Sequence, residues 1–186
     1  MNNLAYTFNF QGYFCYAEAK NLNEHVLEIR RKVLGDEHPD TLTSMHNLAS
    51  VLSFQGYCAD AKELDEYVLE IRRKVLGDEH PDTLSSMNNL AYTLRNHGDY
   101  AGARKFYEQV LNIMRKALGD EHPDTSTSAW NLYVTLLNMG EPDAANDIMK
   151  KHLIWLIDSD PMYLAAELHE IRERVIQIIG EKNRVE

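Results

Sequence analysis

Apolar side chains recur along the chain at the spacing of one face of an α-helix. One stretch places them three or four residues apart, at Leu42, Met45, Leu48, Ala49 and Leu52. A second stretch repeats this spacing, at Ala61, Leu64, Val68, Ile71 and Val75. Because a helix turns about once every 3.6 residues, both stretches predict amphipathic helices with one buried face. Between them lies "FQGY", where Gly56 predicts a turn.

This helix–turn–helix pattern returns at a fixed distance. The heptapeptide GDEHPDT starts every 42 residues, at Gly35, Gly77 and Gly119. The tripeptide NLA, or NLY in the last copy, starts at Asn3, Asn47, Asn89 and Asn131. Its first step is 44 residues, because two additional residues lie between Tyr13 and Ala19. Such a period indicates stacked helix pairs, since one pair cannot bury both apolar faces alone.

The heptapeptide contains local signals for a helix end and a helix start. Gly35 stands where a helix ends and a left-handed backbone is expected. Pro39 suits the first turn of the next helix, and Asp40 places negative charge near the positive end of that helix. The second copy has the same residues 42 positions later. We therefore interpret the heptapeptide as the joint between two helix pairs.

The joints also contain acidic and histidine triplets, at Asp36–Glu37–His38, Asp78–Glu79–His80 and Asp120–Glu121–His122. Carboxylate and imidazole groups bind metals, but consecutive residues of an exposed loop rarely converge on one ion. The sequence also contains no recognisable motif for a nucleophile elbow, a phosphate-binding glycine loop or a Cys/His dyad. The sequence therefore predicts no catalytic residues, no metal site and no cofactor.

Four features together resemble the tetratricopeptide repeat (TPR), in the 42-residue form of kinesin light chains. They are HPDT at His80–Thr83, NNLA at Asn88–Ala91, the glycine turn, and VLEIRRKVLG at Val68–Gly77. The resemblance covers about residues 1–157. It implies a right-handed α-α superhelix whose first helices line a concave groove. It also implies a scaffold without enzymatic activity that binds extended peptides or partner proteins.

The predicted fold is therefore all-α, with about four helix pairs and a C-terminal capping helix. We expect repeats at about residues 1–35, 36–77, 78–119 and 120–157. The capping helix is expected at 158–180 and a tail at 181–186, because one apolar stripe contains Leu164, Leu168, Ile171, Val175 and Ile178. Pro161 comes four residues before the position that the period predicts. The second helix of the fourth repeat is thus expected to be about one turn short.

The first repeat starts in an unusual register. Met1 aligns with Met45 and Met87, which lie inside the first helices of their repeats. Two interpretations are open. The chain is part of a longer repeat protein, or this end stacks on a second copy and forms a homo-oligomer.

The asparagines that recur once per repeat are the strongest candidate for ligand contact. They are Asn3, Asn47, Asn89 and Asn131. The resemblance implies that the asparagine at this position hydrogen-bonds the backbone of a bound peptide. A side-chain amide both donates and accepts hydrogen bonds, so it can bind the backbone of a peptide whatever the side chains of that peptide are. The alternative is that these amides bond a neighbouring helix or its loop.

Two arginines and several aromatic residues are further candidates. Arg30 and Arg72 begin the "RRK" segment, and the resemblance implies that they engage acidic ligand residues; Met114 and Leu156 stand there in later repeats. The first-helix positions three residues after each asparagine hold Tyr6, Ser50, Tyr92 and Val134, and those just before it hold Asn2, His46, Asn88 and Trp130. Tyr92 and Trp130 are plausible anchors for ligand side chains. The alternative to ligand contact is a set of local ion pairs for the arginines and packing between helices for the aromatic residues.

Composition narrows the functional classes. Apolar residues make up 44% of the chain and charged residues 26%, as in ordinary soluble proteins. A net charge of −10 argues against nucleic-acid binding, which needs a positive surface. Neither a leader nor a membrane span is evident, and two cysteines are too few for a disulfide framework, so we expect a cytoplasmic protein.

The leading functional hypothesis is a scaffold that docks an extended protein or peptide, with acidic residues in the ligand. The alternative is a self-associating repeat array, or the sensor fragment of a larger multidomain protein.

Overall fold

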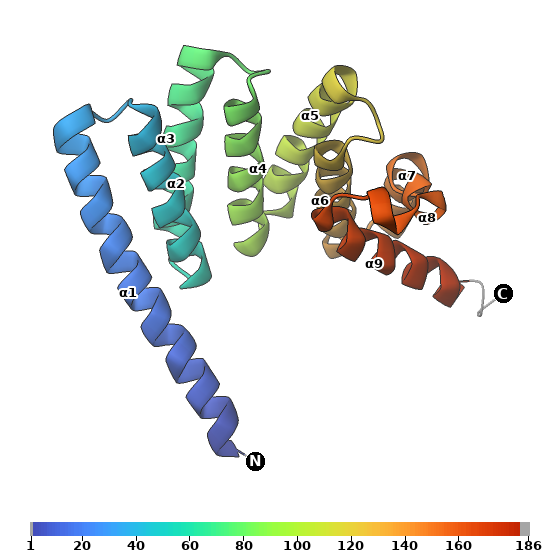
Figure 1. Cartoon of the computed structure of the whole chain (residues 1–186), viewed down its shortest axis with the longest axis horizontal. Helices are drawn as coiled ribbons and strands as arrows, with labels where there is room; N and C mark the ends of the chain where they lie inside the picture. Colours follow the sequence, from blue (N-terminus) through green and yellow to red (C-terminus); the bar gives the residue numbers. More distant parts are fainter. Residues whose placement is uncertain (1, 183–186) are drawn as a thin grey trace. The chain divides into compact units, whose positions relative to one another are not determined.

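The chain is built of helices joined by short turns (Figure 1). This computed structural model describes the backbone of residues 2–182 and the side chains of residues 18–166 and 168–180. The elements are α1 (Asn2–Leu34), α2 (Pro39–Phe54), α3 (Cys58–Leu76), α4 (Pro81–Asn96), α5 (Tyr100–Leu118), α6 (Pro123–Asn138), α7 (Pro142–His152), α8 (Trp155–Asp158), the 3-10 helix η1 (Pro161–Tyr163) and α9 (Ala166–Lys182). No strand occurs within the described backbone, and the predicted all-α helical-repeat class is confirmed.

The helices form two compact parts, residues 1–98 and residues 99–186. In the N-terminal part, α2 contacts α1, α3 and α4. All five apolar residues predicted for the first-helix stripe are buried in α2. In α3 the predicted stripe is buried at Ala61, Val68 and Ile71 and half-buried at Leu64, but Val75 is exposed. The predicted stripe is therefore one turn too long at its C-terminal end.

The joint between α3 and α4 has the expected residues at both helix ends. Gly77 follows α3 with φ 88° and ψ 167°, and Pro81 begins α4. The sequence predicted a left-handed backbone at this glycine. The positive φ agrees with that prediction, but the extended ψ shows that the residue is not in the left-handed helical conformation. This region of backbone space is open almost only to glycine. The chain thus leaves α3 through an extended glycine conformation and not through a left-handed helical cap.

The first repeat differs from the others. α1 runs without interruption from Asn2 to Leu34, past Gly12, which corresponds to the turn residue Gly56. Glycine inside a helix costs only about 1 kcal/mol relative to alanine, so a long helix can contain it. The two additional residues between Tyr13 and Ala19 lie within this same helix.

In the C-terminal part, α6 contacts α5, α7 and α9. Three residues of the predicted capping stripe, Leu168, Ile171 and Val175, are buried in α9. Ile178 is half-buried in the same helix, and Leu164 precedes α9. α7 has 11 residues whereas α3 has 19, so it is shorter than predicted by more than one turn. The Trp155 indole donates to the carbonyl of His152, the last residue of α7, at 3.1 Å and so satisfies one of the carbonyls that a helix end leaves free.

Candidate functional site

Two asparagines project from neighbouring first helices in the N-terminal part. Asn47 on α2 is exposed, and Asn89 on α4 is half-buried. Among the residues that the structure describes, none hydrogen-bonds either side-chain amide. Within the described side chains, the bonds to a neighbouring helix or loop that were the alternative interpretation are therefore not found. We call this surface the α2–α4 face; it comprises His46, Asn47, Phe54, Asn89, Tyr92 and Arg95.

An aromatic cluster lies on the same face, towards the helix C-termini. The rings of Phe54 and Tyr92 are 6.4 Å apart, and both residues are exposed. The Arg95 guanidinium lies 5.2 Å from the centre of the Tyr92 ring, a cation–π contact. Tyr92 was predicted as a candidate, whereas Phe54 and Arg95 were not. The helical period could have found them, because Phe54 is two turns after Asn47 and Arg95 one turn after Tyr92.

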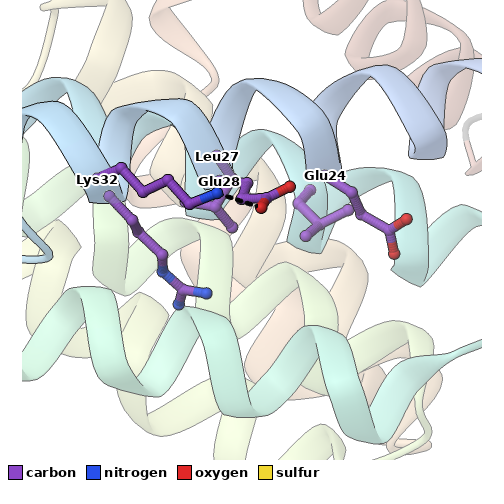
Figure 2. A pocket seen from close by; sticks show the side chains of 6 residues that line it. Glu24, Leu27, Glu28 and Lys32 are labelled. Carbon is purple, nitrogen blue, oxygen red and sulfur yellow. Dashed lines mark hydrogen bonds and ion pairs between the residues drawn. The ribbon is translucent and has the colours of Figure 1, made fainter.

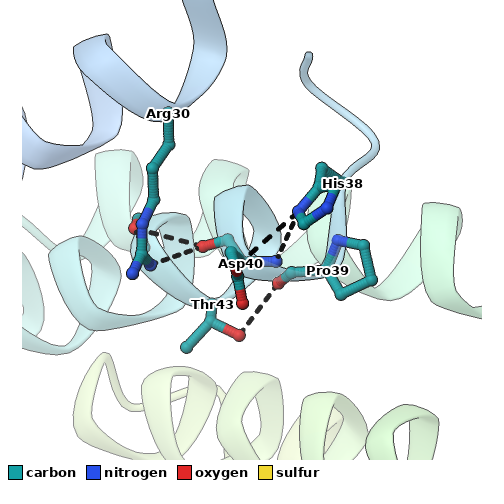
Figure 3. Close-up of polar contacts among 6 residues, drawn as sticks. Arg30, His38, Pro39, Asp40 and Thr43 are labelled. Carbon is teal, nitrogen blue, oxygen red and sulfur yellow. Dashed lines mark hydrogen bonds and ion pairs between the residues drawn. The ribbon is translucent and has the colours of Figure 1, made fainter. Parts of the chain in front are cut away.

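The candidate arginines hold the joint between helices. Arg30 donates from Nη1 to the carbonyl of Asp40 and to Oγ of Ser44, both at 2.8 Å (Figure 3). Arg72 makes the same two bonds one repeat later, to Asp82 at 3.0 Å and Ser86 at 2.9 Å. These bonds link the end of each second helix to the start of the next first helix. Contact with acidic ligand residues stays a prediction.

The third repeat keeps this joint without an arginine. Met114 is buried, and its sulfur accepts a hydrogen bond from Oγ of Ser128 at 3.3 Å. Methionine therefore fills the position that Arg30 and Arg72 occupy in the earlier repeats. This substitution offers a natural variant for testing the arginines.

The acidic and histidine triplets have structural roles at helix starts. His38 caps α2, because its Nδ1 accepts a hydrogen bond from the backbone N–H of Asp40 at 3.1 Å (Figure 3). Asp36 pairs with Arg31 at 3.0 Å. The later copies repeat both contacts, with caps at His80 and His122 and ion pairs at Arg73–Asp78 and Arg115–Asp120. Within the described side chains, no three His, Cys, Asp or Glu residues come together as metal ligands.

The corresponding first helix of the C-terminal part is partly covered. Asn131 on α6 is half-buried, and no described residue hydrogen-bonds its side-chain amide. Trp130 beside it stacks on Tyr133, with ring centres 5.2 Å apart. Arg174 of α9 lies 5.9 Å from the Trp130 ring. Trp130 therefore packs within the C-terminal part. Asn3 and Tyr6 lie outside the side chains that the structure describes.

A buried histidine strengthens the joint between α5 and α6. His152 of α7 is buried, and its Nδ1 lies 3.0 Å from Oδ1 of Asp120. Burial lowers the pKa of His152, although the hydrogen bond with Asp120 opposes this shift. The hydrogen bond from Arg115 lowers the pKa of Asp120. The pair thus favours a neutral imidazole that donates from Nδ1 to a carboxylate.

A surface hollow of about 460 Å³ lies between α1 and α2. It is lined by Glu24, Leu27, Glu28, Arg31, Lys32 and Leu48, four of which are labelled in Figure 2. Lys32 and Glu28 pair there at 2.6 Å, and this hydrogen bond lowers the pKa of Glu28. Because the charged side chains at its rim neutralise one another, the hollow offers less to a ligand than the α2–α4 face does.

Solved structures resemble the chain over nearly its whole length. Two crystal structures of a kinesin light chain-like protein from Podosopora anserina, with nearly identical TPR-like repeats, have 31% and 30% sequence identity and TM-scores of 0.75 and 0.74. Each match covers 95% of this chain and 84% of that protein. BtubC (BKLC) from P. vanneervenii shares the fold at 22% identity and a TM-score of 0.66, over 80% of this chain and 59% of its own.

No curated protein matches the sequence. None of the described helices combines the length and apolarity that a membrane span requires. The tetratricopeptide repeat family matches three consecutive segments, residues 1–40, 41–82 and 83–124, and the second and third have the length of the 42-residue period. The chain therefore belongs to the tetratricopeptide repeat family, whose repeats are scaffolds for protein interaction.

Proposed function

We propose that the chain docks an extended segment of a partner protein on the α2–α4 face. The observation that carries this proposal is the pair of side-chain amides at Asn47 and Asn89. They project from adjacent first helices and have no hydrogen-bond partner among the described residues. An amide that donates and accepts can pair with both groups of a peptide bond. Two such amides can therefore hold a peptide backbone whatever its side chains are.

The spacing of the helices suits an extended ligand. α2 and α4 contact each other, and packed helices lie about 8–10 Å apart. An extended chain rises about 3.3 Å per residue, so one step between helices corresponds to roughly three ligand residues. Phe54 and Tyr92 then offer exposed rings to the side chains in between.

Acidic residues of the ligand would meet Arg30 and Arg72 next to this face. Each arginine uses Nη1 for the joint, and a guanidinium has five N–H donors. A guanidinium can therefore hold the joint and a ligand carboxylate together. This part of the proposal makes binding of acidic peptides weaker at high salt.

The test is a calorimetric titration with peptides selected from a randomised library on the wild-type protein. Replacing both Asn47 and Asn89 by Ala should weaken binding about tenfold or more, because each lost hydrogen bond contributes roughly 1 kcal/mol. Asn112→Ala is the matched control, since it removes an exposed amide from the second helix α5. Unchanged affinity in the double variant, or a library without binders, would contradict the proposal.

A second candidate function is end-to-end association through α1. Leu22 and Ile29 on α1 are 65% and 48% exposed, whereas Ile71, one period after Ile29, is 8% exposed. In α3 the equivalent stripe packs on α2, so α1 presents an apolar stripe that a further helix pair would cover. Sedimentation should show self-association that Leu22→Glu and Ile29→Glu together abolish. A monomer at every concentration would exclude this function.

A further inference from the structure

A carboxylate is enclosed directly behind the α2–α4 face. Asp65 of α3 is 3% exposed. Thr93 of α4 donates from Oγ1 to Oδ2 of Asp65 at 2.7 Å, and Nδ1 of His46 on α2 lies 3.3 Å from Oδ1. The carboxylate thus connects three helices of the N-terminal part. Of its two partners, His46 belongs to the α2–α4 face, where it directly precedes Asn47.

The hydrogen bonds determine which imidazole nitrogen carries the proton. An ionised carboxylate only accepts hydrogen bonds, so Nδ1 of His46 must donate to Asp65. In a neutral imidazole the other nitrogen, Nε2, then has a lone pair and accepts. His46 is 28% exposed in its side chain, and no described residue hydrogen-bonds Nε2. An acceptor of fixed orientation is therefore available beside Asn47.

The residues that correspond to His46 and Asp65 in the later repeats do not form a histidine–carboxylate pair. The residues that correspond to His46 in the next two repeats are Asn88 and Trp130, and Tyr107 corresponds to Asp65. Tyr107 is fully buried, so a neutral residue fits this place in the fold. Because burying a carboxylate is costly, stability alone favours the neutral residue. The contribution of Asp65 that a neutral residue would not make is to keep the imidazole proton of His46 on Nδ1.

We propose that His46 is a specificity-determining residue of the α2–α4 face, positioned by Asp65. Its Nε2 accepts a hydrogen bond from a Ser or Thr hydroxyl, or from an amide N–H, of the ligand residue docked beside Asn47. A carboxylate at that ligand position meets a lone pair and is rejected. This inference rests on the proposed docking function and gives one ligand position a defined chemistry.

The proton position can be measured without any ligand. Long-range ¹H–¹⁵N spectra at about pH 8, where imidazoles are neutral, should show His46 protonated at Nδ1. In Asp65→Asn the Thr93 hydroxyl can keep donating to the amide oxygen, which turns the amide NH2 towards His46, so the ring should change to the Nε2-protonated form. Thr93→Val is the matched control, because it removes the other bond to Asp65 and should leave the tautomer unchanged. A wild-type ring protonated at Nε2, or one that averages between forms, would overturn the inference.

The ligand preference is tested by selecting a randomised peptide library on three proteins: the wild type, Asp65→Asn and His46→Asn, which carries the residue of the next repeat. Wild-type selections should enrich hydroxyl or amide residues at one position. Those peptides should bind both variants about tenfold more weakly, and Asp65→Asn should admit acidic residues there. Circular dichroism verifies the fold of each variant.

The outcomes separate this inference from the docking function. Binding that depends on Asn47 and Asn89 but shows no difference among the three selections refutes the role of His46 alone. Binding that is insensitive to both asparagines refutes the docking function and, with it, this inference.

Discussion

The helices α4 and α6 are the first helices of consecutive repeats, but they present different surfaces. On α4, Tyr92 lies next to the exposed Phe54 of α2. On α6, Trp130 stacks on Tyr133 and makes a cation–π contact with Arg174 of the capping helix. The asparagine is retained in both, so its presence in the sequence does not determine its surroundings. Whether a repeat is available for a ligand depends on which helix packs beside it.

The largest difference is expected when the aromatic residues are removed from each surface. Trp130→Ala should lower the free energy of unfolding by about 2 kcal/mol, because it removes a half-buried ring from two contacts. Tyr92→Ala should lower it by about 0.5 kcal/mol or less, since that ring is exposed. Urea denaturation measures both. Equal losses would show that the two surfaces do not differ as described.

Acidification should destabilise the C-terminal part through His152. Burial lowers its pKa in the folded state, so the unfolded chain binds this proton first as pH falls below about 6.5. Stability from His152 is therefore present above that pH and is lost as pH decreases towards the folded-state pKa. His152→Asn preserves a donor to Asp120 and cannot titrate. Thermal unfolding should show a smaller decrease in Tm between neutral and mildly acidic pH in the variant, and equal decreases would contradict this account.

Replacing Arg72 by Met gives the joint the residue of the third repeat. The variant should fold and lose about 1 kcal/mol of stability, because two hydrogen bonds are removed while Met114 shows that methionine fits. Calorimetry should also show weaker and less salt-dependent binding of acidic peptides. Unchanged salt dependence would assign Arg72 to the joint alone.

The smallest effect is expected at the contact between α9 and Trp130. Arg174→Gln should lower the free energy of unfolding by about 0.5 kcal/mol, the magnitude of an exposed cation–π contact. Glu170→Gln is the matched control, since it breaks the Glu170–Arg174 ion pair and keeps the arginine. A loss of the same size in the control would assign the effect to the ion pair instead.

Most of the fold was predictable because each repeat specifies its own local structure. The period, the glycines with positive φ, the prolines at helix starts and the buried stripe of α2 all follow from residues close in the sequence. A short second helix in the fourth repeat was predicted from Pro161, whereas the continuous α1 and the full extent of the shortening of α7 were not. The fixed repeat period specifies neither the helix that continues through Gly12 nor the hydrogen bond from the Trp155 indole to the end of α7.

The candidate site was predictable only in part. The recurrence of Asn47 and Asn89 identified them, and Tyr92 followed from its distance to Asn89. Asp65 could not be recognised, because its partners His46 and Thr93 are 19 and 28 residues away and lie on different helices. Sequence spacing reports which residues share one helix face, whereas this pair depends on how three helices pack.

The most direct test of the account maps a selected peptide on the protein by ¹H–¹⁵N NMR spectroscopy. The side-chain amide signals of Asn47 and Asn89 should shift on titration, together with the signals of Tyr92. The amide signal of Asn112 on the second helix α5 should stay in place. Shifts confined to the second helices α3 and α5, with Asn47 and Asn89 unchanged, would contradict the claim that the α2–α4 face is the docking surface.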